Sequence, residues 1–196
     1  MYTLVLGPDG ELHIVKAPGE LVIGAYAPVE DITHKVTAAL IASQQLLYLD
    51  LSPAKKHLGG TILAQCFAQA GDDCADVEDV PLLKRMFEAT QELVAQGLIT
   101  AVHDVSDGGF ITCVLEMAFA GGVGLEVKVK SSHNALAAMF AEEPGLIIAC
   151  EPDKLEQVQA VLEAAEVPAM VVGSSREAGD DRVEIVFNGE AVISDE

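Results

Sequence analysis

The sequence predicts an α+β domain with α/β-like layers, in which helices pack against a mixed β-sheet. Three observations support this class. Short apolar runs typical of strands recur along the chain, they alternate with helical apolar spacing in its middle, and hairpin signatures occur at both ends. The 196 residues suffice for a sizeable hydrophobic core. We therefore expect residues 1–196 to form a single domain.

The leading β segment is expected over residues 1–30. Tyr2–Leu6 and Leu12–Lys16 flank the turn sequence GPDG, which is typical of a hairpin. A third, longer strand is expected over Leu21–Val29. The chain begins abruptly, with no cap or tail before the first strand, which suggests a fragment of a longer multidomain polypeptide. Residues 31–43 fit either a helix or a loop.

Two strand–loop–helix units occupy the middle of the chain. In the first, the apolar run Leu46–Leu51 predicts a buried strand, and a glycine-containing loop leads to a helix over Ile62–Ala70. In the second, Leu98–Val102 predicts a strand, and apolar residues recur at helical spacing from Phe110 until a group of glycines ends the helix.

The remaining elements continue the alternation of helices and strands. Helices are expected over Pro81–Gly97, Asn134–Ala141 and Pro152–Ala165, and strands over Leu125–Val129, Leu146–Cys150, Ala169–Gly173, Arg182–Phe187 and Ala191–Ser194. The pair Asn188-Gly189 is a strong two-residue hairpin signal. Residues 180–196 are therefore expected to close the domain as a hairpin.

The composition is that of a soluble globular protein, with 51% hydrophobic and 21% charged residues. A net charge of -20 argues against a broad nucleic-acid or anionic-membrane surface. No signal peptide or long apolar span is recognised, so we expect no membrane partner.

The cysteines indicate a reducing compartment. They number four and include no CxxC pair, so neither a disulfide framework nor a zinc site is expected. Cys66, Cys113 and Cys150 lie in apolar runs and are expected to be buried, whereas Cys74 lies in an acidic stretch. The cytoplasm is the expected location.

The turn between the second predicted strand and its helix is a candidate phosphate or nucleotide site. Its residues are His103, Asp104, Ser106, Asp107, Gly108 and Gly109. Ser106 or Asp107 is placed to cap the helix, and the free N–H groups of a helix start attract anions. The alternative is a plain capped turn with no ligand.

The loop after Leu51 is a second candidate of the same kind. Its residues are Lys55, Lys56, His57, Gly59, Gly60 and Thr61. Three potentially cationic side chains beside two glycines suit a phosphate ester or polyphosphate, and Thr61 or the glycines can begin the next helix. The alternative is a solvated basic turn. His34 and His133 are expected to be ordinary surface residues.

Three sequence blocks carry a family resemblance. They read LLYLDLSPAKKHLGGTILAQCFAQAGDDCADVEDV, ITAVHDVSDGGFITCVLEMAFAGGVGLEV and MFAEEPGLII, in this order and spacing. In them the chain resembles large-type phosphoribosylformylglycinamidine synthase, also called formylglycinamide ribonucleotide amidotransferase. The resemblance is to the second aminoimidazole-ribonucleotide-synthetase-like C-terminal domain of that enzyme and covers about Val22 to Asn188.

This resemblance implies a function in de novo purine synthesis. The family converts formylglycinamide ribonucleotide, glutamine and ATP to formylglycinamidine ribonucleotide, needs magnesium with ATP, and is a carbon–nitrogen ligase with glutamine as amide donor. The implied fold is the synthetase-superfamily C-terminal domain, partly ferredoxin-like. Both candidate loops match family signatures, and Glu142 and Glu143 match an acidic pair before a buried strand. Asp104, Asp107 or Glu143 is then a candidate for magnesium or a ribose hydroxyl.

One feature of the chain resembles the second half of that enzyme, which is implied to be largely structural. Ser106-Asp107 stands where the catalytic half carries small residues, which implies a largely structural nucleotide site and no catalytic residue here. The implied partners are the ATP-binding synthetase-like domains and the glutaminase domain, so the isolated chain is expected to be inactive. Three alternatives stay open: a stand-alone nucleotide- or phosphate-binding domain, a purely structural domain, and a related synthetase, such as aminoimidazole ribonucleotide or selenophosphate synthetase.

Overall fold

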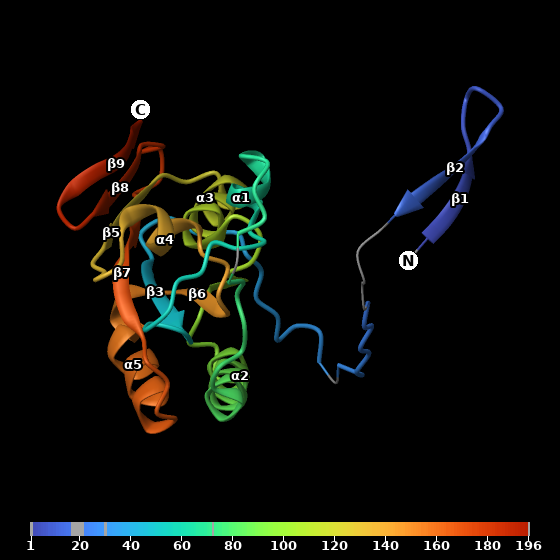
Figure 1. Ribbon diagram of the computed structural model, residues 1–196. Helices are drawn as coiled ribbons and strands as arrows, with labels where there is room; N and C mark the ends of the chain where they lie inside the picture. The colour runs from blue at the N-terminus through green and yellow to red at the C-terminus, as the bar shows by residue number, and fades with distance from the viewer. Residues whose placement is uncertain (1, 17–21, 30, 72, 196) are drawn as a thin grey trace. The chain divides into compact units, whose positions relative to one another are not determined.

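The computed structural model of the protein describes residues 2–16, 22–29, 31–71 and 73–195. The chain divides into two compact units, Met1–Ile32 and Thr33–Glu196 (Figure 1). Among the described residues, no helix combines the length and the apolar character needed to cross a membrane.

The first unit contains the expected hairpin. Strands β1 (Tyr2–Leu6) and β2 (Leu12–Lys16) are antiparallel, with Leu4 opposite Ile14. The third strand, expected over Leu21–Val29, is wrong: residues 22–29 form no strand, and Leu21 lies outside the described residues. A strand needs a neighbour to satisfy its backbone hydrogen bonds, and no described segment pairs with this one.

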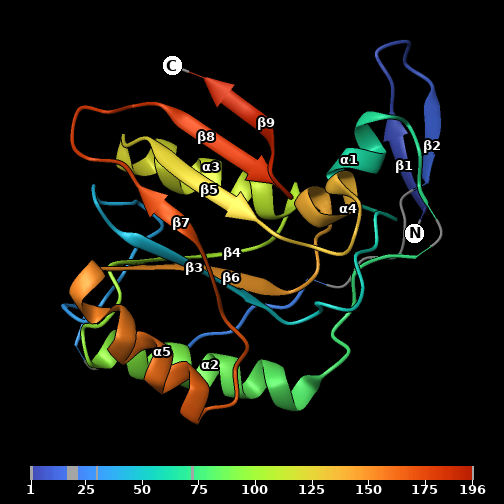
Figure 2. The ribbon, with the colours of Figure 1, turned by 90° about the vertical axis from the view of Figure 1, so that its left-hand side faces the viewer.

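The second unit is a seven-stranded mixed sheet with helices on both faces (Figure 2). Its strands are β3 (Gln45–Asp50), β4 (Ala101–Asp104), β5 (Leu125–Val129), β6 (Gly145–Cys150), β7 (Met170–Ser175), β8 (Val183–Phe187) and β9 (Glu190–Asp195). Its helices are α1 (Ile62–Cys66), α2 (Val80–Ala95), α3 (Gly109–Gly121), α4 (Ala135–Phe140), η1 (Pro152–Lys154, a 3-10 helix) and α5 (Leu155–Ala164).

The order of strands in this sheet is β4-β6-β3-β7-β5-β8-β9. Every neighbouring pair is antiparallel except β5 and β8, which are parallel. The expected α+β class with a mixed sheet is therefore confirmed. The closing hairpin is also confirmed, since Asn188 and Gly189 both have positive φ and join β8 to β9.

Two hydrophobic clusters, one on each face of the sheet, hold the helices against it. On one face, α3 contributes Phe110, Val114 and Met117 to a cluster with residues of the sheet and α4. On the other face, α2 and α5 lie side by side and bury residues such as Leu93 and Leu162 (Figure 2).

Of the two alternatives left open for residues 31–43 the structure shows the loop, and helix α1 is shorter than expected. Residues 31–43 are turns and loop, of which Thr37 forms a short parallel bridge to Ala101. Helix α1 stops at Cys66, earlier than the expected end at Ala70, because Ala68 has a φ of 53° that an α-helix does not tolerate.

Candidate functional site

The sheet topology brings both predicted glycine-bearing loops to one place. Strands β3 and β4 each pair antiparallel with β6, so Asp50 lies opposite Gly145 and Asp104 lies opposite Leu146. The ends of β3 and β4 therefore meet the start of β6 at one end of the sheet. We call residues 51–61, 105–108 and 141–144, which leave or enter the sheet there, the loop cluster.

Glu142 joins the two predicted loops. Its Oε1 atom accepts hydrogen bonds from the backbone N–H of Ile62, at 2.9 Å, and from that of Gly108, at 2.8 Å. These donors lie at the starts of α1 and α3. An anion does sit between the two helix starts, and it is a carboxylate of the protein itself.

Glu143 holds the other side of the first loop. Its Oε1 atom accepts a hydrogen bond from the backbone N–H of His57 at 2.8 Å. The same oxygen lies 2.9 Å from Nδ1 of His57, without hydrogen-bond geometry. The Glu143 side chain is buried, and its Oε2 atom has no hydrogen-bond partner among the described residues.

The two lysines of the first loop both pair with carboxylates. Lys56 Nζ lies 2.8 Å from Asp50 Oδ1, and both side chains are buried. Lys55 is exposed and pairs with Glu78; this hydrogen bond and the charge of Glu78 raise the pKa of Lys55. The ring of Tyr48 lies 5.9 Å from Lys56 Nζ, and burial, followed by the charges of Asp50 and Glu143, raises the Tyr48 pKa far above its usual range.

The glycines of the first loop let it pack closely against the backbone of Ala70 and Asp73. The N–H of Gly59 donates to the carbonyl of Asp73 at 2.8 Å, and that of Gly60 donates to the carbonyl of Ala70 at 2.6 Å. A Cβ atom at Gly59 would lie 2.3 Å from the oxygen of Asp73, so no side chain fits there. Thr61 caps α1 as expected, since its hydroxyl accepts from the N–H of Ala64.

The second loop differs from its expected form at the helix start. The expected cap by Ser106 or Asp107 is wrong: both side chains are exposed, and α3 begins after Gly108, with no side-chain cap of its own. The physical reason is that Gly108 occupies the N-cap position and has no side chain to accept a hydrogen bond, while its own N–H donates to the distant Glu142. The N–H of Gly109 turns back to the carbonyl of Ser106 at 2.9 Å.

The two polar residues before this turn lie at the end of β4. His103 Nδ1 is 2.8 Å from the carbonyl oxygen of Asp104, and its Nε2 is 3.3 Å from a carboxylate oxygen of Glu116. The Asp104 side chain is largely exposed. Within the described ranges, no three His, Cys, Asp or Glu side chains are grouped to hold a metal ion.

The acceptors that organise the loop cluster, Asp50 and Glu142, were not predicted in these roles. The acidic pair 142–143 was noted, but its contacts depend on strand pairing that a single sequence does not reveal. The cysteines were predicted in part: Cys113 and Cys150 are buried, whereas Cys66, expected to be buried, is exposed because α1 covers no core.

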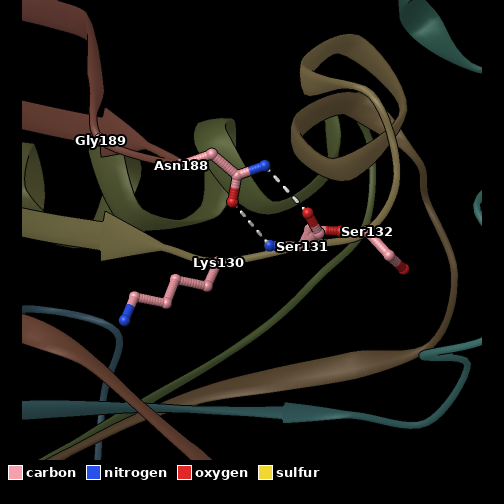
Figure 3. A pocket seen from close by; sticks show the side chains of 5 residues that line it. All are labelled: Lys130, Ser131, Ser132, Asn188 and Gly189. Carbon is pink, nitrogen blue, oxygen red and sulfur yellow. Dashed lines mark hydrogen bonds between the residues drawn. The ribbon is translucent and has the colours of Figure 1, made fainter.

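A shallow pocket of about 530 Å³ lies at a different part of the sheet. It is lined by Lys130, Ser131, Ser132, Asn188 and Gly189 (Figure 3). The Asn188 side chain bonds to the backbone N–H and carbonyl of Ser131, at 3.1 and 2.9 Å, so its polar atoms connect the β8–β9 turn to the segment that follows β5. Lys130 extends away from this pair (Figure 3). None of the predicted site residues lines this pocket.

Comparison with models of protein families shows to which family the chain belongs. The model of the AIR synthase related protein, C-terminal domain, matches residues 44–186. The chain belongs to this family. The match covers the sheet from β3 to β8 and the whole loop cluster, so both candidate loops are parts of the AIR synthase related domain.

Curated relatives of this AIR synthase related domain are much longer proteins. The chain is 44% identical over 170 residues to "Probable phosphoribosylformylglycinamidine synthase, chloroplastic/mitochondrial" of Arabidopsis thaliana, covering 85% of the chain and 12% of the relative. It is 44% identical over 186 residues to "Phosphoribosylformylglycinamidine synthase" of Homo sapiens, covering 92% of the chain and 14% of the relative. The chain therefore spans about an eighth of the length of these relatives.

Solved structures share the fold. PurL of T. maritima complexed with FGAR superimposes with a TM-score of 0.65 at 18% identity, over 83% of this chain and 29% of that one. The same protein complexed with ATP gives a TM-score of 0.64 at 15% identity, over 84% of this chain and 27% of that one. These likenesses confirm the synthetase-type fold of the AIR synthase related domain.

Proposed function

We propose that this chain is one domain of a phosphoribosylformylglycinamidine synthase, which converts formylglycinamide ribonucleotide to formylglycinamidine ribonucleotide with ATP and glutamine. The observation that carries the proposal is 44% identity to two synthases along most of the chain. The complete enzyme is an ATP-dependent carbon–nitrogen ligase of purine synthesis. Its other parts, the ATP-binding synthetase-like domains and the glutaminase domain, are the proposed partners.

ATP or ADP with Mg²⁺ is the proposed cofactor set of the complete enzyme, in line with PurL structures complexed with ATP and ADP. The loop cluster alone does not fit a bound triphosphate, because its glycine N–H groups and Lys56 already have partners in the protein. We therefore assign this chain an architectural role, with no synthase activity in isolation. The proposed location is the cytoplasm, consistent with four cysteines that form no disulfide.

The test is an in-frame deletion of the coding region for residues 33–196 in the source organism. The expected result is growth that depends on added purine, together with accumulation of formylglycinamide ribonucleotide in extracts. Reintroduction of the intact gene should reverse both effects. Purine-independent growth without accumulation of this ribonucleotide contradicts the proposal.

The isolated chain provides a second test. Incubated with formylglycinamide ribonucleotide, ATP, glutamine and Mg²⁺, it should produce neither ADP nor formylglycinamidine ribonucleotide. Turnover above a buffer blank would contradict the architectural role, while leaving the assignment to the synthase intact.

The alternative to an architectural role is that the two loops bind a nucleotide or phosphate, which their meeting at one end of the sheet supports. This alternative requires the protein's own acceptors to leave the glycine N–H groups. The proposed ligands of such a nucleotide are the side chains and N–H groups of Lys55, Lys56, His57, Gly59, Gly60, Thr61, His103, Asp104, Ser106, Asp107, Gly108 and Gly109. Calorimetric titration of the full chain with ADP and Mg²⁺ tests it. No heat of binding up to millimolar ADP contradicts it.

A further inference from the structure

We propose that Glu142 is a positioning residue that acts as a built-in anion, locking the two glycine-bearing loops together and closing their helix starts to an external phosphate. This inference concerns contacts within the chain and goes beyond the proposed reaction. It stands or falls independently of which enzyme contains the domain.

The geometry of one oxygen atom is the first support. Glu142 Oε1 accepts from both Ile62 and Gly108, at 2.9 and 2.8 Å. The two donors are separated from Glu142 by 80 and 34 positions in the sequence, so one carboxylate joins three segments that are distant along the chain. A carboxylate that accepts two N–H groups makes short, charge-assisted hydrogen bonds.

The position of Gly108 at the start of α3 is the second support. Helix α3 has 13 residues, and its aligned peptide dipoles place positive partial charge at this end. Neither side chain expected to cap it does so. The negative charge that favours such a helix start therefore comes from Glu142.

The use of every glycine amide in the two loops is the third support. The N–H groups of Gly59, Gly60 and Gly109 donate to the backbone carbonyls of Asp73, Ala70 and Ser106, and that of Gly108 donates to Glu142. A phosphate bound by these amides would have to displace acceptors of the protein. Among these four glycines, only Gly108 donates to a side-chain carboxylate, so Glu142 is the group whose removal would open an anion position.

Glu143 holds the first loop at a second point. It accepts from the N–H of His57, at 2.8 Å, while Glu142 accepts from that of Ile62. The two adjacent glutamates thus hold both ends of the segment from His57 to Ile62. Removing the Glu142 carboxylate leaves the Glu143 contact in place, so the loop should stay near its position and leave an anion-sized vacancy.

The experiment compares thermal unfolding of the full chain for wild type, Glu142→Ala, Glu142→Gln and a control, Glu88→Ala. Glu88 is an exposed glutamate on α2, with one ion pair of 3.7 Å to Lys84. Each protein is measured in inorganic phosphate, in acetate, and in chloride of equal ionic strength. Glu142→Ala should melt about 5 °C below wild type in chloride. Phosphate or acetate should restore about half of that loss, with no matching rise for wild type or Glu88→Ala.

Equal responses to phosphate in all four proteins would overturn the proposal, as would a Glu142→Ala chain as stable as Glu88→Ala in chloride. Should Glu142→Ala fail to fold, Glu142→Gln keeps the proposal testable. Its amide oxygen still accepts but carries no charge, so amide hydrogen exchange at Ile62 and Gly108 should be on the order of tenfold faster than in wild type. Unchanged exchange at both positions would overturn it.

Discussion

The Nζ atom of Lys56 lies 2.8 Å from Oδ1 of Asp50, and the side chains of both residues are less than a tenth exposed. A lysine that the sequence marks as a phosphate ligand is thus half of a buried ion pair. Asp50 also accepts the N–H of Ser52 at 2.9 Å, which fixes the turn that leaves β3. This buried ion pair therefore fixes the conformation at the start of the first loop.

Lys56→Met should lower the free energy of unfolding by about 3 kcal/mol, because it leaves the Asp50 charge buried without its partner. Urea unfolding followed by circular dichroism measures this change. The double substitution Lys56→Met with Asp50→Asn should recover part of the loss. Lys84→Met, at an exposed position, is the control and should change stability little. A Lys56→Met loss no larger than the control contradicts the prediction.

The Tyr48 hydroxyl should stay protonated at high pH. Burial raises its pKa, so the folded state keeps a proton that the unfolded state loses above about pH 10. The stabilisation is complete below that pH and declines as the pH rises further. With three tyrosines and no tryptophan, absorbance at 295 nm reports their ionisation directly. The part of the absorbance change that comes from Tyr48 should appear only when the chain unfolds, and the substitution Tyr48→Phe should remove it. Ionisation of Tyr48 in the folded chain contradicts the prediction.

Two thiols should react quickly and two slowly. Cys66 and Cys74 are exposed, whereas burial raises the pKa of Cys113 to about 12 and that of Cys150 to about 11. The thiolate is the reactive form, so the buried pair should react only after unfolding. Ellman's reagent at pH 8 measures both phases. The double variant Cys66→Ser with Cys74→Ser should lose the fast phase; a fast phase that persists shows the buried thiols to be accessible.

Gly109→Ala should destabilise the chain far more than Gly122→Ala. Both glycines have positive φ, of 71° and 62°. A Cβ atom at Gly109 would lie 2.6 Å from the carbonyl oxygen of Met139, whereas one at Gly122 meets nothing within 4 Å. The backbone cost of about 1 kcal/mol is common to both, and the clash should add roughly 2 kcal/mol at Gly109. Equal losses of unfolding free energy for the two variants, measured in urea, would contradict the prediction, because they would show that the backbone at Gly109 shifts to accept the new methyl group.

Most secondary structure could be predicted because apolar spacing and turn residues are local signals. The runs around Leu46–Leu51 and Leu146–Cys150 have strand length and glycine or proline nearby, and both became central strands. The segment Leu21–Val29 has the same local signal, but described residues 22–29 form no strand, because a strand also requires a partner.

The candidate site was predicted as a set of loops but not as a set of contacts. Gly59 and Gly108 are recognisable from sequence as special backbone positions, and both are indeed tightly placed. Their acceptors are not recognisable, because Glu142 meets Gly108 only after β4 and β6 have paired. Sequence alone distinguishes a glycine loop from a helix, but not a glycine that binds phosphate from one that binds a glutamate.

The pairing of β6 between β3 and β4 has a consequence for synthesis of the chain on the ribosome. The segment of His57 is made early, but the acceptor of its N–H, Glu143, lies 86 positions later. A nascent chain that ends before this glutamate holds β3, β4 and both glycine loops, but lacks β6, the strand that joins them. Such non-local contacts form slowly and leave apolar strands exposed meanwhile. The growing chain must therefore extend past the acidic pair at 142–143 before β6 can join β3 to β4.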